Sequence, residues 1–110
     1  MIDWARIRDL QDEIGEDGFA EVVELFLTET GAVVARLHDP PDPGMLEADL
    51  HFLKGGVLNL GFTQVASLCQ QGEAMAARGE AEQIDLTGII QAYEQARSLF
   101  MRDMSGCLSG

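Results

Sequence analysis

Residues 19–44 read "FAEVVELFLTETGAVVARLHDPPDPG", a long apolar repeat that stops at a cluster of prolines. Apolar side chains recur at intervals of three and four residues from Phe19 to Leu37, while glutamates and Arg36 take the other positions. That spacing is typical of an amphipathic helix with one buried face. The prolines end it, because proline cannot continue the backbone hydrogen bonding and disfavours helical geometry in the residue before it. The segment therefore predicts a long helix over about 18–38, followed by a turn.

Apolar periodicity predicts four further helices around this segment. Three bundle helices follow it over about 44–60, 63–78 and 82–104, and a short helix precedes it over about 3–14. Asp3 is placed to cap the short helix, and Gly61 and Gly79 are expected to end the helices before them. The last residues, 105–110, are small and polar, so we expect them to fray as a tail.

The fold class follows from the absence of any strand pattern in the sequence and from the short connections. Short loops make neighbouring helices antiparallel. A chain of 110 residues is the size of one ordinary domain. We therefore predict an all-α domain over residues 1–110, folded as an antiparallel four-helix bundle with a short N-terminal helix.

The composition argues against several partners and locations. Seven basic residues face nineteen acidic ones, for a net charge of −12, so the chain is not expected to bind nucleic acid or a membrane surface. The N-terminus has acidic residues where a signal peptide would be apolar, and no apolar run is long enough for a membrane span, so the expected location is cytoplasmic. Cys69 and Cys107 lack a paired spacing and are expected to be free thiols, and no metal site is expected.

The helix predicted at about 44–60 carries the most informative polar group. Its sequence includes "HFLKGGVLNLG", residues 51–61, and the apolar stripe of that helix centres roughly 140° away from His51 at 100° per residue. The histidine is therefore expected to face solvent, with Lys54, Gly55 and Leu58 following on the same face. A neutral imidazole is a nucleophile, and a nearby ammonium can stabilise a phosphoryl group carried on its nitrogen. This arrangement suits phosphoryl chemistry.

Two adjacent glycines interrupt the same helix. Each costs roughly 1 kcal/mol relative to alanine inside a helix, so some benefit must offset them. The missing side chain at Gly55 would let another protein approach His51 closely. Gly56 lies at the margin of the buried stripe, where a small residue permits close helix packing.

The segment "HFLKGGVLNLG" resembles the signature of histidine phosphotransfer (HPt) domains, which has a histidine, then x-x-Lys-Gly, then a glycine six residues later. The matching residues are His51, Lys54, Gly55 and Gly61. The resemblance extends more loosely over the rest of the chain, and it implies a four-helix bundle. It also implies that His51 is the phosphoacceptor and Lys54 its charge partner, in transfer between response-regulator receiver domains or from sensor histidine kinases.

The sequence departs from the family pattern at two glycines. Gly56 stands where the family commonly has serine or alanine, and Gly72 stands where a larger apolar residue is usual. Both departures are expected to loosen the bundle without removing a group that transfer needs.

A third site residue follows from hairpin geometry. In an antiparallel pair of helices turning near Phe62, His51 and Glu73 are each eleven residues from the turn and should lie side by side. A carboxylate that accepts a hydrogen bond from one ring nitrogen selects the tautomer and raises the basicity of the other nitrogen. Glu73 is therefore expected to orient His51, and members of the family often carry glutamine or glutamate at this place.

Two functions remain open at this point. The first is a phosphocarrier of a two-component phosphorelay, phosphorylated stoichiometrically on His51, with Gly55 and Leu58 on the face that docks the receiver domain. It needs no cofactor of its own, Mg²⁺ being expected on the receiver, and no independent ATP-dependent kinase activity is expected because no glycine-rich phosphate loop occurs. The alternative is a helical adaptor that docks on receiver or kinase domains without being phosphorylated. His38 lacks comparable neighbours and is given no role.

Overall fold

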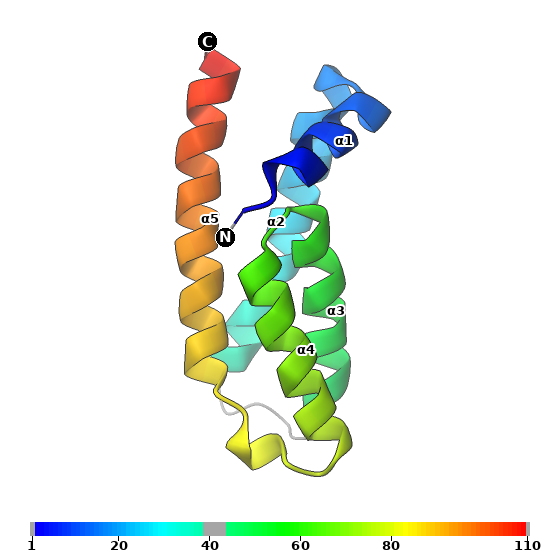
Figure 1. Cartoon of the computed structure of the whole chain (residues 1–110), viewed down its shortest axis with the longest axis vertical. Helices are drawn as coiled ribbons and strands as arrows, with labels where there is room; N and C mark the ends of the chain where they lie inside the picture. Colours follow the sequence, from blue (N-terminus) through cyan, green and yellow to red (C-terminus); the bar gives the residue numbers. More distant parts are fainter. Residues whose placement is uncertain (1, 39–43, 110) are drawn as a thin grey trace.

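The computed structural model describes residues 2–38 and 44–109, without the side chains of residues 16 and 103–109. Its helices are α1 (Trp4–Ile14), α2 (Glu16–His38), α3 (Leu46–Asn59), α4 (Thr63–Ala77), the single 3-10 turn η1 (Ala81–Gln83) and α5 (Leu86–Ser109). Helices α2 to α5 lie side by side with alternating direction, and α1 packs near the end where α2 begins (Figure 1). The predicted all-α four-helix bundle with a short N-terminal helix is confirmed.

The first helix begins and ends as its sequence predicts. The Asp3 side chain accepts a hydrogen bond from the backbone N–H of Arg6, at 3.2 Å, which satisfies one of the free donors of the first turn. Gly15 ends the helix with a φ of +87°, a conformation that glycine adopts at little cost. Helix α2 follows at once, so the chain changes direction at this glycine.

Two predicted boundaries need correction at the C-terminal helix. Helix α5 begins at Leu86 rather than near residue 82, because Asp85 caps it by accepting a 2.9 Å hydrogen bond from the backbone N–H of Gly88. The predicted fraying tail over 105–110 is wrong for 105–109, where α5 continues to Ser109. That stretch contains no proline, so its backbone hydrogen bonding can continue. Residues 39–43 of the predicted proline turn lie outside the described residues, as does residue 110.

The core joins all the helices through apolar side chains. Its largest fully buried members are Phe19, Leu50, Leu53, Leu60, Phe62 and Phe100. Phe62, in the turn between α3 and α4, packs edge-on against Tyr93 and Phe100 of α5. Trp4 of α1 stacks on Phe100, with ring centroids 5.9 Å apart. These rings connect the N-terminal helix, the α3–α4 turn and the last helix.

Helices α2 and α3 approach closely at Gly56. A Cβ atom there would lie 2.5 Å from Cγ2 of Thr30, so the predicted packing role of this glycine is confirmed. Thr30 is fully buried, and its hydroxyl donates to the carbonyl of Phe26 and lies 2.7 Å from the Tyr93 hydroxyl. A Cβ atom at Gly72 would lie 2.8 Å from Leu50. Neighbouring side chains therefore fill the space beside both glycines, and the expected loosening of the bundle is not seen.

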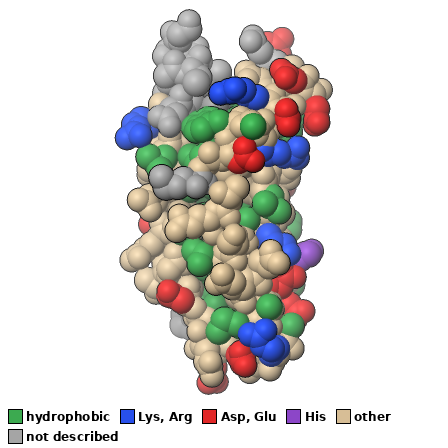
Figure 2. Space-filling view, in the orientation of Figure 1, with side chains coloured by type: hydrophobic (Ala, Val, Ile, Leu, Met, Phe, Trp, Pro, Cys, Tyr) green, Lys and Arg blue, Asp and Glu red, His purple; other side chains and the backbone are tan. Residues whose placement is uncertain are grey.

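The surface carries few cationic groups. On the face shown in Figure 2 the Lys and Arg side chains stand singly among acidic and uncharged ones, so they form no basic patch there. None of the described helices combines the length and the apolar character that a membrane span requires.

Candidate functional site

His51 and Glu73 meet across the α3–α4 hairpin. Nδ1 of the imidazole lies 2.8 Å from Oε1 of the carboxylate, a hydrogen-bond distance. The hairpin turns at Gly61, whose φ of +72° suits glycine, and Phe62 follows it with no exposed surface. The expected proximity of Glu73 to His51 is therefore present, and so is the expected exposure of the imidazole, whose side chain is 69% accessible.

Lys54 completes the cluster in a way that sequence reasoning missed. Its ammonium lies 3.0 Å from Oε2 of Glu73, and the lysine side chain is only 24% exposed. The distance makes this contact an ion pair to a buried carboxylate oxygen. Glu73 thus connects the imidazole and the ammonium, one oxygen to each. The one-turn spacing of His51 and Lys54, together with a carboxylate opposite, was the signal that could have found it.

The electrostatics of the cluster keep Glu73 ionised. The contact with the Lys54 ammonium is the main cause that lowers the pKa of Glu73 below its ordinary value of 4.5. Burial opposes this change, and the hydrogen bond with His51 adds to it. A carboxylate can only accept hydrogen bonds, so Nδ1 of His51 must carry the proton. The neutral imidazole then has its lone pair on Nε2, which is the nucleophilic nitrogen.

A second nucleophile lies close to this cluster but is inert. Cys69 sits one turn before Glu73 on α4 and has no exposed surface. Burial, and then the charge of Glu73, raise the pKa of its thiol from 9.0 to about 12. The thiol therefore stays protonated at neutral pH and does not compete with His51. Cys69 is free, as predicted, and the side chain of Cys107 lies outside the described residues.

The surface around His51 is open and partly apolar. A Cβ atom at Gly55 would meet no atom within 4 Å, which confirms that this glycine faces outward. Leu58 is 47% exposed, as expected for the outer face. Phe52, next to His51, is 51% exposed and was not singled out from the sequence. An aromatic residue directly following the outer-face histidine is the signal that sequence reasoning passed over.

His38, the other histidine, takes no part in this cluster. Its Nε2 atom lies 3.6 Å from a carboxylate oxygen of Glu94 on α5. The two histidines therefore have different environments. His51 shares Glu73 with a lysine, whereas His38 has a single exposed carboxylate partner.

The comparison with known families agrees with this geometry. A family model described as Hpt domain matches residues 21–99, a span that runs from α2 into α5 and includes His51, Lys54 and Glu73. The chain belongs to the Hpt domain family. Such domains perform histidine phosphotransfer in phosphorelays, together with receiver domains and kinases. No curated protein and no solved structure gives a significant match.

Proposed function

We propose that this protein carries a phosphoryl group on His51 in a two-component phosphorelay. It exchanges this group with a sensor histidine kinase, with response-regulator receiver domains, or with both. The observation that carries the proposal is the contact of Glu73 with both His51 and Lys54. It prepares an exposed imidazole with one defined nucleophilic nitrogen and places a cation one turn away. This arrangement suits phosphoryl transfer, whereas an adaptor that is not phosphorylated would not need it.

In the proposed transfer, Nε2 of His51 attacks the phosphorus of an aspartyl phosphate on a receiver domain. The new P–N bond forms as the bond from phosphorus to the aspartate oxygen breaks, and the aspartate leaves as a carboxylate. The imidazole becomes positively charged, and Glu73, which accepts from Nδ1–H, stabilises that charge. The reverse sequence returns the phosphoryl group to an aspartate.

Lys54 supplies the second charge in this step. Its ammonium neutralises Glu73 in the free protein and can turn towards the phosphoryl oxygens once they arrive, because its stem is flexible. The protein contributes no cofactor to the proposed reaction. Mg²⁺ is supplied by the receiver domain, and the carrier needs no ATP-dependent kinase activity of its own.

The docking face of this proposal surrounds His51. Gly55 leaves room for the partner's active-site loops one turn beyond the histidine, while Leu58 and Phe52 offer apolar contact area. A cytoplasmic location belongs to the same proposal, since receiver domains and kinase cores operate there.

The test is phosphoryl transfer from a panel of phosphorylated receiver domains to three proteins: wild type, His51→Gln and His38→Gln. We expect acid-labile, base-stable phosphate on the wild type and on His38→Gln, and none on His51→Gln. His38→Gln is the matched control because it removes the chain's other histidine. Label on His51→Gln at the normal rate would refute the assignment. Binding to receivers without any labelling of the wild type would favour the adaptor.

A further inference from the structure

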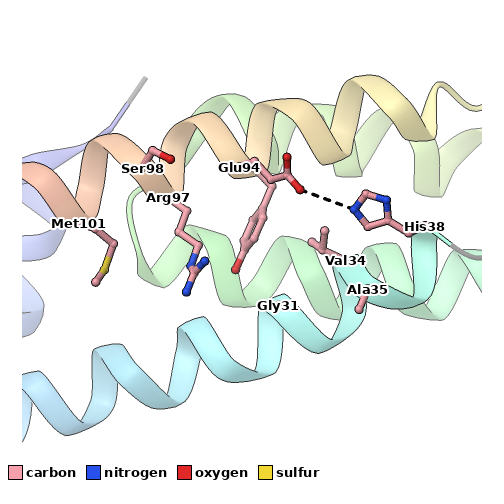
Figure 3. Close-up of a pocket in the computed structure, with 9 residues that line it drawn as sticks. Gly31, Val34, Ala35, His38, Glu94, Arg97, Ser98 and Met101 are labelled. Atoms are coloured by element: carbon pink, nitrogen blue, oxygen red, sulfur yellow. Dashed lines mark ion pairs between the residues drawn. The ribbon is translucent and has the colours of Figure 1, made fainter.

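A groove runs between α2 and α5, on elements that do not carry His51. One hollow of about 570 Å³ is lined by both helices and ends at His38 (Figure 3). A second, of about 450 Å³, continues from it towards Ala20 of α2. Arg97 and Met101 of α5 line both hollows, so we treat the two as one α2–α5 groove. Along α2 it extends over about 27 Å at 1.5 Å per residue.

The groove exists because small residues of α2 face α5. A Cβ atom at Gly31 would meet only the Tyr93 hydroxyl, at 3.8 Å, so a larger side chain there would enter the hollow. Apolar side chains line both hollows: Val34 and Tyr93 in the first, Val23 and Leu27 in the second, and the half-exposed Met101 in both. The groove therefore presents an apolar floor, and volumes of several hundred Å³ are typical of small-molecule sites.

Arg97 is the charge that distinguishes this groove. Three other cations have carboxylate partners, in the pairs Arg36–Asp49, Lys54–Glu73 and Arg78–Glu80. Within the described part of the chain, Arg97 has no ion pair or hydrogen bond, although acidic residues outnumber basic ones by nineteen to seven.

The two carboxylates that line the groove do not neutralise Arg97. Figure 3 shows the Arg97 side chain extending from α5 towards α2, while Glu94 turns to His38, 3.6 Å away. Glu24 lines the second hollow but forms no ion pair with Arg97. The groove thus combines a guanidinium that forms no ion pair with a partly apolar lining.

We propose that the α2–α5 groove binds a monoanionic amphiphile, with its carboxylate on Arg97 and its aliphatic chain along the apolar floor. A guanidinium binds a carboxylate through two parallel hydrogen bonds, and the exposed side chain of Arg97 is accessible to such a ligand. A polyanion fits less well, because Glu24 and Glu94 line the same groove and the whole chain carries a charge of −12. The same net charge opposes a second copy of this chain as the occupant.

The test uses decanoate below its critical micelle concentration as the probe, with decanol as an uncharged probe of equal chain length. Titration of ¹⁵N-labelled protein should give saturable shifts on α2 and α5 amides that line the groove, with the amides around His51 unaffected. Arg97→Gln should weaken decanoate binding about tenfold, the loss of one charged hydrogen-bonded contact. Arg36→Gln is the matched control and should bind like wild type, because Arg36 pairs with Asp49 away from this groove.

A second variant tests the apolar floor separately from the charge. Gly31→Leu should fill the hollow and abolish binding while the thermal unfolding transition is retained, because position 31 opens into the groove. Equal affinity for decanol, unchanged affinity in Arg97→Gln, or shifts confined to other helices would each overturn the proposal. So would a concentration-dependent dimer, detected by light scattering, that buries the groove and excludes decanoate.

Discussion

The adjacent glycines of α3 should respond to the same substitution with opposite signs. Gly55→Ala places a methyl group where no atom lies within 4 Å, so it should stabilise the protein by up to about 1 kcal/mol through helix propensity. Gly56→Ala places its methyl carbon 2.5 Å from Cγ2 of Thr30. Thr30 cannot rotate away without breaking its buried hydrogen bonds to Phe26 and Tyr93. Overpacking costs about 1–3 kcal/mol, and the 2.5 Å approach to a side chain that cannot move places this case in the upper part of that range. After a gain of up to about 1 kcal/mol from helix propensity, Gly56→Ala should be less stable than the wild type by about 1–2 kcal/mol.

Urea and thermal unfolding measure both variants against the wild type. A change of 1 kcal/mol moves the Tm of a domain of this size by about 4 °C, so the two variants should lie clearly on either side of the wild type. Thr30→Ser removes Cγ2 while keeping the hydroxyl, and combining it with Gly56→Ala should recover much of the lost stability. A Gly56→Ala variant as stable as the wild type would refute the packing argument, and a destabilised Gly55→Ala would refute the outward placement of Gly55.

Three further changes address the site itself. Gly55→Gln should raise the Tm yet slow phosphoryl transfer, because its side chain would stand one turn beyond His51; an unchanged transfer rate would contradict the access argument. Lys54→Met should slow transfer and raise the pKa of Glu73, because the Lys54 ammonium is the main cause of its lowering. Carboxyl ¹³C NMR titration measures this pKa, and an unchanged value would contradict the pairing of Lys54 with Glu73. Because the pKa of Glu73 is lowered in the folded protein, its contacts with Lys54 and His51 stabilise the fold fully above about pH 4.5, the ordinary pKa of the group. This stabilisation is lost as the pH falls through the lowered pKa of the folded state. Glu73→Gln should remove that part of the acid dependence, measured by urea unfolding from pH 7 to 3, and an identical pH profile would argue against it.

The features predicted from sequence are those set by regular local geometry. The 3.6-residue period located the helices, and the symmetry of an antiparallel hairpin placed Glu73 opposite His51. The pairing of Lys54 with Glu73 was missed because a long, flexible side chain can reach several partners. Which of them it contacts depends on how the helices pack. The start of α5 was placed too early because residues 81–83, which form the 3-10 turn η1, are good helix formers that directly precede the Asp85 cap.

Other features depend on distances between helices that no local pattern encodes. The exposed Phe52 is one of them, since its accessibility depends on how far α2 covers that side of α3. The α2–α5 groove is another, because it requires Gly31 and Arg97, 66 residues apart, to lie across one seam.

The proposed transfer requires His51 to present one defined nitrogen to the phosphoryl group. The most direct measurement is ¹⁵N–¹H NMR of the imidazoles after phosphorylation by a receiver domain, with mass-spectrometric mapping of the phosphorylated residue. We expect phosphate on Nε2 of His51, with the proton on Nδ1 still hydrogen-bonded to Glu73. Phosphate on Nδ1 of His51, on His38 or on a residue other than histidine would contradict it.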